Sequence, residues 1–165
     1  MNLHRMLSRV RRYRVNHGFG VHSPFAYHFI TRVLRETLPY YDFARLNAVS
    51  IDERDARMLY RTLVYFNPSR VCVVGKGSDV VKMALPSCAI VNSPSDADMT
   101  VWTASTAADS TLPTDSPLLF VRGTRHSGWR NLRSRWPAGM TFTNGHIGIA
   151  VNRHGLPRQD YRLTF

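Results

Sequence analysis

The chain has 165 residues, the size of one domain, and 44% of them are hydrophobic, a composition that excludes wholesale disorder. Its two cysteines make neither a disulfide framework nor a zinc cluster, and no apolar run reaches the roughly 18 residues of a membrane-spanning helix. The basic N-terminus is not followed by an apolar stretch, so it does not read as a secretory signal. The sequence therefore predicts a soluble, cytoplasmic protein.

The net charge of +11 is distributed unevenly along the chain. Residues 1–35 hold seven arginines and no acidic residue, residues 36–119 are net acidic, and residues 120–165 hold eight arginines and one aspartate. Arginine binds phosphate and carboxylate groups through two parallel hydrogen bonds, so two arginine-rich ends are typical of a protein that binds nucleic acid, anionic lipid or an acidic partner. Codon usage in a GC-rich genome is the alternative origin of the same composition.

Two helices are predicted in the N-terminal part. Residues 1–16 have apolar side chains at every third or fourth position, which indicates a basic amphipathic helix that packs on its own domain or contacts a partner or membrane surface. Ser23 has the character of an N-cap and Pro24 suits the first helical position, so a second helix should run from there to about Leu38.

A third helix is predicted over residues 52–66, because its first turn is acidic and Leu59, Leu63 and Val64 would face inward. After this helix the pattern changes to short apolar runs rich in β-branched residues, typical of parallel strands buried on both faces. Strands are expected at 70–74, 88–92, 98–102 and 117–121, and helices at 79–85 and 129–136.

The C-terminal region predicts a hairpin of strands 140–144 and 147–151 around Asn144-Gly145, followed by a last strand over 161–165. The fold class is therefore α/β: a reduced Rossmann-like sheet of six or seven strands with an antiparallel C-terminal edge. We expect a helical extension over residues 1–50 and a Rossmann-like domain over 51–165, together forming a single compact unit. Only ten residues separate Ile90 from Val101, so this connection is either unusually tight or has lost an element.

The strongest local motif is Gly75-Lys76-Gly77, which follows an all-apolar strand and precedes a helix that starts near Ser78. Glycines at this place let the backbone approach a ligand, and the helix N-terminus supplies hydrogen-bond donors. The alternative interpretation is an ordinary turn from strand to helix.

Three segments carry a resemblance to a known family. Residues 14–25 read RVNHGFGVHSPF and are followed by YHFI, residues 63–75 read LVYFNPSRVCVVG, and the chain closes with QDYRLTF over 159–165. Together with the predicted hairpin, these resemble a family of bacterial class I S-adenosylmethionine-dependent methyltransferase-like proteins. The resemblance implies a Rossmann-like domain and S-adenosylmethionine as cofactor. The residues that it places around the cofactor are Gly75, Gly77, Ser78, Asn92 and Ser93.

The chain also departs from that family where side chains should hold the cofactor. Val73 stands where the resemblance implies an acidic residue, Asn92-Ser93 replaces the acid that binds the ribose hydroxyls, and Arg122 replaces acids after a later strand. Residues 101–106 lack the expected Asp, Asn and His, and the segment of the family's third strand is missing. Each lost hydrogen-bonding partner costs about 1–3 kcal/mol, so the cofactor is not expected to bind. The oxygen ligands of a hard metal ion are missing as well, so no metal site is expected.

The leading interpretation is a shortened, degenerate methyltransferase that serves as a binding or structural protein, with a homologous protein or a second copy as partner. Two alternatives stay open: an active methyltransferase with an altered pocket, and a module that binds nucleic acid weakly through its basic ends. No catalytic residue is assigned. Trp129 and Trp136 alternate with arginines, but core packing is expected for them rather than stacking on bases. If the basic ends converge on one face, the arginines concentrated there would be Arg9, Arg11, Arg12, Arg130, Arg133 and Arg135.

Overall fold

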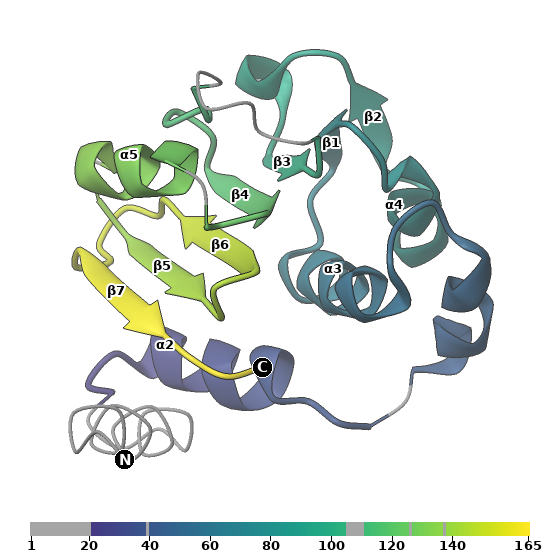
Figure 1. Ribbon diagram of the computed structural model, residues 1–165, viewed down its shortest axis with the longest axis horizontal. Coiled ribbons are helices and arrows are strands. Elements are labelled where there is room, and N and C mark those ends of the chain that lie inside the picture. The colour runs from purple at the N-terminus through teal and green to yellow at the C-terminus, as the bar shows by residue number, and fades with distance from the viewer. Residues whose placement is uncertain (1–20, 39, 105–110, 126, 137) are drawn as a thin grey trace.

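A seven-stranded mixed sheet organises the chain, with strands in the order β2-β1-β3-β4-β6-β5-β7 (Figure 1). The computed structural model describes residues 21–38, 40–104, 111–125, 127–136 and 138–165. The strands are β1 Arg70–Val74, β2 Ala89–Val91, β3 Met99–Trp102, β4 Leu118–Arg122, β5 Met140–Thr143, β6 Ile147–Val151 and β7 Gln159–Arg162. The helices are α2 Pro24–Phe29, which continues as a π-helix over Ile30–Leu34, α3 Glu53–Phe66, α4 Ser78–Ala84 and α5 Ser127–Arg135, with 3-10 turns at Tyr41–Ala48 and Pro94–Asp96.

Strand directions confirm the predicted α/β class. Strands β1 to β4 are parallel to one another, β6 runs antiparallel to both β4 and β5, and β7 is parallel to β5. The β5–β6 hairpin turns at Asn144, whose Oδ1 accepts hydrogen bonds from the backbone N–H groups of His146 and Ile147, both at 2.8 Å. The hairpin predicted from Asn144-Gly145 is therefore present, with three residues between the strands.

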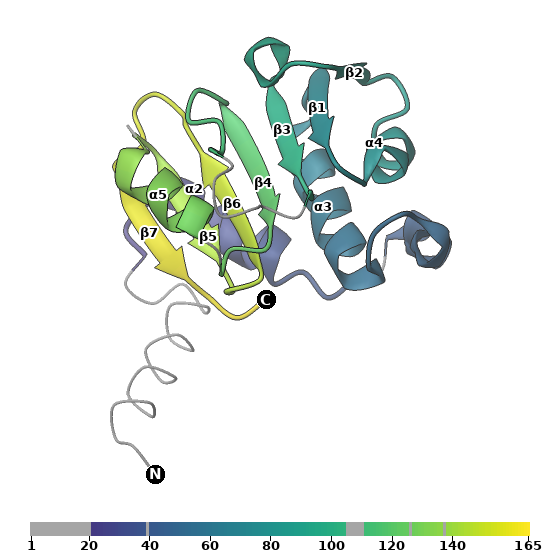
Figure 2. The same ribbon diagram turned by 45° about the horizontal axis from the view of Figure 1, so that its top comes forward.

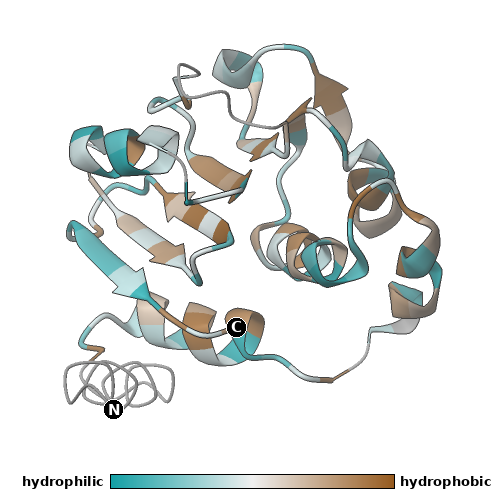
Figure 3. Ribbon diagram, viewed as in Figure 1, coloured by the Kyte–Doolittle hydropathy of each residue, from teal (hydrophilic) through white to brown (hydrophobic). Residues whose placement is uncertain are grey.

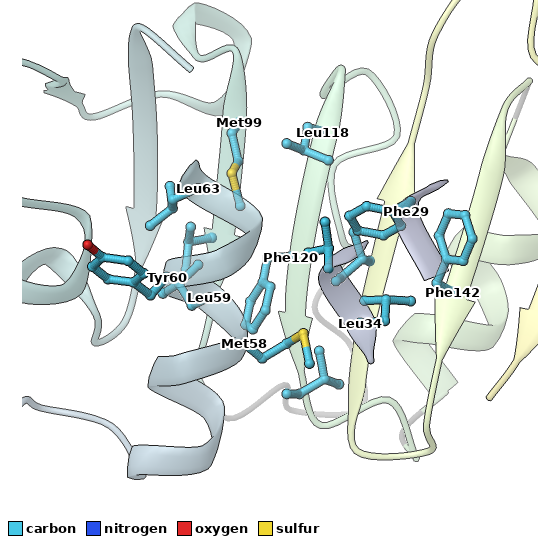
Figure 4. Packing of buried hydrophobic residues seen from close by; sticks show 14 of the residues in the cluster. Phe29, Leu34, Met58, Leu59, Tyr60, Leu63, Met99, Leu118, Phe120 and Phe142 are labelled. Atoms are coloured by element: carbon cyan, nitrogen blue, oxygen red, sulfur yellow. The ribbon is translucent and has the colours of Figure 1, made fainter. Parts of the chain in front are cut away.

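The helices cover the sheet from two sides (Figure 2). Helices α2, α3 and α4 pack in one large apolar cluster, whereas α5 packs on the opposite face in a smaller cluster with Leu119, Val121 and Ala150. Phe120 of β4 lies at the centre of the larger cluster, between side chains of α3 and Phe29 of α2 (Figure 4). Phe29 and Leu46 belong to this cluster, so the described part of the N-terminal extension shares its core with the sheet.

The start of α2 follows the sequence prediction, and its end does not. Ser23 Oγ accepts a hydrogen bond from the backbone N–H of Ala26 at 3.3 Å, which confirms Ser23 as the N-cap. The helical segment ends at Leu34 rather than at Leu38. The reason is local: Glu36 Oε1 accepts from the backbone N–H of Leu38 at 2.8 Å, a bond that competes with continued helix. The predicted helix over 1–16 lies outside the described residues.

Helix α3 matches its prediction apart from one side chain. It begins one residue after Asp52 and ends at Phe66, where Asn67 has a positive φ of 46°. Leu59 and Leu63 are fully buried as expected, but Val64 is exposed, so its predicted inward orientation was wrong. Val64 lies next to the buried stripe of the helix, where a prediction from periodicity is least certain.

The second predicted strand is present but not buried. β2 spans only three residues, its side chains are exposed or half-buried, and Ile90 is among the exposed large hydrophobic residues. Its place at the edge of the sheet explains the difference, since β1 flanks it on one side only. The short connection to β3 holds only the 3-10 turn Pro94–Asp96, so the chain crosses β1 without a helix.

The last strand begins two residues earlier and ends three residues earlier than its prediction of 161–165. β7 runs over Gln159–Arg162 because its register is set by β5, with Met140 opposite Gln159 and Thr143 opposite Arg162. Within the described residues, no helix is both long enough and apolar enough to cross a bilayer.

Candidate functional site

The glycine turn between β1 and α4 lies where the parallel strands end, at the edge of the sheet formed by their carboxyl ends. Gly75 and Gly77 both have positive φ, 104° and 115°, a conformation that side chains disfavour. Ser78 is the first residue of α4 and is exposed. The turn therefore has the conformation predicted for a glycine turn that leads from a strand into a helix.

The side of Gly75 on which a Cβ atom would project is filled by the segment after β3, while Gly75 itself stays exposed. A Cβ atom on Gly75 would lie 2.5 Å from the backbone nitrogen of Ala104 and 2.7 Å from Thr103 Oγ1. The Lys76 backbone N–H donates to Thr103 Oγ1, which itself donates to the Lys76 carbonyl, both at 2.6 Å. The Thr103 N–H donates to the Val74 carbonyl at 2.9 Å. The close approach that glycine permits is thus made by the protein's own chain.

Ser50, from the N-terminal extension, occupies the start of α4. The Gly77 backbone N–H donates to Ser50 Oγ at 3.1 Å. Ser50 donates in turn from its backbone N–H and its hydroxyl to the two carboxylate oxygens of Asp79, at 2.6 and 2.9 Å. A carboxylate in the first turn complements the positive end of the helix dipole. The Gly77 donor at the start of α4 is therefore used internally, and Asp79 offsets the positive end of the helix dipole.

Asn92 and Ser93 follow β2 at the same edge of the sheet, because β2 is parallel to β1 and Val91 pairs with Cys72. Ser93 Oγ lies 2.7 Å from Ser95 Oγ and caps the 3-10 turn that follows, while Asn92 is exposed. Among the described residues, no hydrogen bond joins either side chain to the glycine turn. The structure thus brings the five predicted cofactor-binding residues to one edge without connecting them into a site.

A polar cluster that the sequence reasoning missed lies at the end of β4. Arg122 Nε donates to Asp55 Oδ2 at 2.7 Å, and Arg122 Nη2 forms an ion pair with Asp52. His146 Nε2, from the β5–β6 turn, lies 3.0 Å from the same Asp55 oxygen. The Asp55 side chain is 2% exposed, whereas Arg122 and His146 are 34% and 51% exposed. The cluster is therefore a buried carboxylate held between an arginine and a histidine.

This cluster connects three parts of the fold rather than forming an open reaction site. Asp55 contacts both Arg122 and His146, so it ties α3 to β4 and to the β5–β6 turn, across 67 and 91 residues of sequence. Buried carboxylates with ion-pair partners are costly to disrupt by removing one partner. In the sequence, Asp52 and Asp55 read only as acidic residues of a helix start, and nothing in it pointed to Arg122 or His146 as their partners.

The carboxylates at this edge also correct part of the sequence interpretation. The acidic residues expected from the resemblance are missing, but Asp52 at the N-cap of α3, Asp55 in its first turn and Asp79 in the first turn of α4 come to the same edge. Each is already engaged, with Arg122, with His146 or with Ser50. The edge therefore carries acidic side chains, and each of them already has a partner within the protein.

A cavity of about 500 Å³ lies between residues 36–47 and α3. Arg57 and Arg61 line it together with Phe43, and the Arg57 guanidinium lies 5.3 Å from the centre of the Phe43 ring. Burial lowers the pKa of Arg61, which donates to the carbonyl of Glu36. Two glutamates, Glu36 and Glu53, also line the cavity, so the charges on its wall balance.

Comparison with known proteins gives no family for this chain: no family model, no curated protein and no solved structure matches it. Among the described residues, no three or more His, Cys, Asp or Glu side chains are grouped so that they could hold a metal ion. The geometry of the sheet edge and of the surface is therefore the basis for a function.

Proposed function

We propose that this protein is a methyltransferase-fold protein that binds a partner and does not use S-adenosylmethionine. The observation that carries the proposal is that backbone donors of the glycine turn already have partners within the protein. The Lys76 N–H donates to Thr103 Oγ1 and the Gly77 N–H to Ser50 Oγ, and Thr103 and Ala104 fill the side of Gly75 on which a Cβ atom would project. A ligand at this turn must first displace parts of the protein that already satisfy the same donors.

The cost of that displacement supports weak or absent cofactor binding. Freeing the turn breaks the hydrogen bond from Lys76 to Thr103 and the bond from Gly77 to Ser50. These bonds are exposed and part-buried, so each contributes about 0.5–1.5 kcal/mol, and the penalty is about 1–3 kcal/mol. Such a penalty weakens binding by roughly 5-fold to 150-fold.

Electrostatics point the same way. The cofactor carries a positively charged sulfonium and a ribose diol, and carboxylates suit both groups. At the end of β4, Asp52 and Arg122 form an ion pair, with side chains 67% and 34% exposed, and the buried Asp55 contacts Arg122 and His146. Because these carboxylates already have partners within the protein, the cluster does not fit a sulfonium cofactor.

The decisive experiment is isothermal titration calorimetry of the full chain with S-adenosylmethionine and with S-adenosylhomocysteine. We expect no binding at low micromolar concentration of either ligand. A methyltransferase that binds both ligands is the positive control. A dissociation constant in the low micromolar range would refute the proposal and favour the active enzyme with an altered pocket.

Thermal unfolding supplies an independent readout. A ligand present at 100 times its dissociation constant stabilises the folded state by about 2.7 kcal/mol. For a chain of this size that corresponds to a rise in Tm of roughly 5–11 °C. We expect no rise with either ligand.

Sedimentation velocity at several concentrations tests whether a second copy of the chain is a partner. A chain that dimerises would show a sedimentation coefficient that increases with concentration.

A further inference from the structure

Helix α5 covers one face of the sheet and is hydrogen-bonded to β7, the last strand of the sheet. Arg133 of α5 donates from Nε and Nη2 to the two carboxylate oxygens of Asp160 of β7, at 3.2 and 2.7 Å. Arg158 Nη2 donates to the carbonyls of Arg133 and Ser134 at 2.9 and 3.2 Å, in the last turn of α5. These bonds fix the position of α5 relative to β7, although the bonded residues are more than 20 positions apart in the sequence.

The alternation of side chains along β7 places Arg162 on the same side of the strand as Asp160, which contacts Arg133 of α5. Side chains two residues apart in a strand point to the same side. Arg162 and Asp160 are exposed, whereas Tyr161 between them stacks on Phe142 in the large cluster. Figure 3 shows that α5 and β7 are both strongly hydrophilic. Five arginines belong to these two elements and to the residue before β7, four of them exposed, and we call them the arginine face: Arg130, Arg133, Arg135, Arg158 and Arg162.

The charge of the arginine face is concentrated and mostly available. Asp160 is its single acidic residue, which leaves a net +4, and Asp160 already accepts from Arg133 and Thr141. Within the described residues, Arg130, Arg135 and Arg162 have no hydrogen bond or ion pair, and all three are exposed. A guanidinium without a partner offers two parallel donors that match a phosphate group.

We infer that the arginine face binds the phosphate backbone of double-stranded nucleic acid. This inference names the partner of the binding protein proposed above and so rests on that proposal. Contacts to phosphates carry no sequence information, so binding should be indifferent to base sequence and strongly dependent on salt. Fixed groups such as Arg133 and Arg158 give the face its shape, and the three free guanidiniums supply the contacts.

The surroundings of the face favour nucleic acid over a lipid surface. A helix that lies on a membrane inserts large apolar side chains between the lipids. The outward side of α5 instead carries Asn131 and Ser134 beside its arginines, and none of the exposed large hydrophobic residues lies in α5 or β7. Anionic lipid is therefore an outcome of the test rather than the expected partner.

Helix α5 and strand β7, which the structure describes in full, place no exposed aromatic ring beside these arginines, and this favours a duplex over single strands. Proteins that bind single strands stack the bases on exposed aromatic side chains. Trp129 and Trp136 of this region are 3% and 1% exposed, buried under α5 in the smaller cluster. The prediction that these tryptophans pack in the core is thus confirmed, and no ring of α5 is available to stack on a base.

The structure also changes which arginines are expected to act together. Arg158 and Arg162 join the three arginines of α5, which sequence reasoning grouped with the N-terminus instead. Arg32 belongs to the π-helix that follows α2, on the opposite face of the sheet. Arg9, Arg11 and Arg12 lie outside the described residues.

The test is fluorescence anisotropy of a labelled 20-base-pair duplex titrated with the full chain at about 50 and 200 mM salt. The face variant combines R130Q, R135Q and R162Q, which removes three charges without breaking a hydrogen bond of the described structure. The control variant combines R32Q, R45Q and K82Q, three exposed basic residues away from the face. Thermal unfolding of both variants shows that each still folds.

We expect three phosphate contacts to make the affinity fall roughly 40-fold between the two salt concentrations. The face variant should bind at least about tenfold more weakly at low salt, and its plot of log affinity against log salt should be flatter by about 2.7. The control should stay close to wild type. No binding at low salt, equal losses in both variants, tighter binding of the single strand, or binding only to vesicles with anionic lipid would each overturn the inference. None of these results affects the calorimetry with S-adenosylmethionine, so the two proposals fail separately.

Discussion

Replacing Gly148 by alanine should destabilise the protein, although Gly148 lies in the middle of a strand where alanine is ordinarily tolerated. Gly148 pairs with Val121 of β4 and Thr143 of β5, and its open side faces α5. A Cβ atom there would lie 2.6 Å from Thr124 Cγ2 and 2.6 and 2.7 Å from two atoms of the Trp129 ring. Glycine is therefore required because the indole lies directly on the backbone of β6.

The magnitude follows from the packing of Trp129, which is buried and has little room to move. Forcing one extra carbon into a packed core costs about 1–3 kcal/mol. The smaller conformational entropy of an unfolded chain with alanine returns about 0.4–1 kcal/mol. We expect a net loss of about 1–2 kcal/mol, which lowers Tm by roughly 2–8 °C in a chain of this size.

Urea unfolding followed by tryptophan fluorescence measures this loss, and a double-mutant cycle tests its cause. A background with Trp129→Phe and Thr124→Ser lacks all three atoms that the new Cβ would meet. Gly148→Ala should cost at least about 1 kcal/mol less in that background than in wild type. Equal costs in the two backgrounds, or a wild-type protein that alanine does not destabilise, would refute the steric explanation.

Two further predictions concern carboxylates. Asp55→Asn should lower the free energy of unfolding by about 1–3 kcal/mol, because Arg122 and His146 lose their buried acceptor. Asp52→Asn, at a side chain 67% exposed, should lower it by less than about 1 kcal/mol. Urea unfolding midpoints compare the two variants, and equal losses would contradict the role of burial. The hydrogen bond from the Arg70 side chain holds the pKa of Asp98 below its ordinary value. Its stabilising contribution is therefore present above the unfolded-state pKa near 4 and is lost as pH falls through the lower folded-state pKa. Asp98→Asn should unfold with a flatter acid dependence than wild type, and an unchanged profile in acid titration monitored by circular dichroism would argue against this pair.

Local signals in the sequence were sufficient for most of the elements. The N-cap at Ser23, the helix from Asp52 to Phe66 and the strand at 70–74 were predicted because caps, periodicity and β-branched runs act over a few residues. The α/β class followed from the order of these elements. The glycine turn was predicted for the same reason, since positive φ at Gly75 and Gly77 is a local requirement.

The tertiary structure alone decided how that turn is used. Whether Gly75 faces a ligand or the chain depends on Thr103 and Ala104, which reach it from another strand. Asp55 and His146 meet across 91 residues of sequence, and no local pattern marks such a pair. The exposure of β2 follows from its place at the sheet edge in the same way.

The surface shows the same division. The arginines of residues 120–165 were evident in the sequence as an excess of charge, together with their tendency to bind phosphate. The arrangement of these arginines was not evident in the sequence. It depends on the register of β7 on β5, which places Arg162 on the side of α5 while Tyr161 points into the core. Composition determines how much charge the chain carries, whereas the pairing of strands distant in sequence decides which charges share a face, since side-chain direction alternates along each strand.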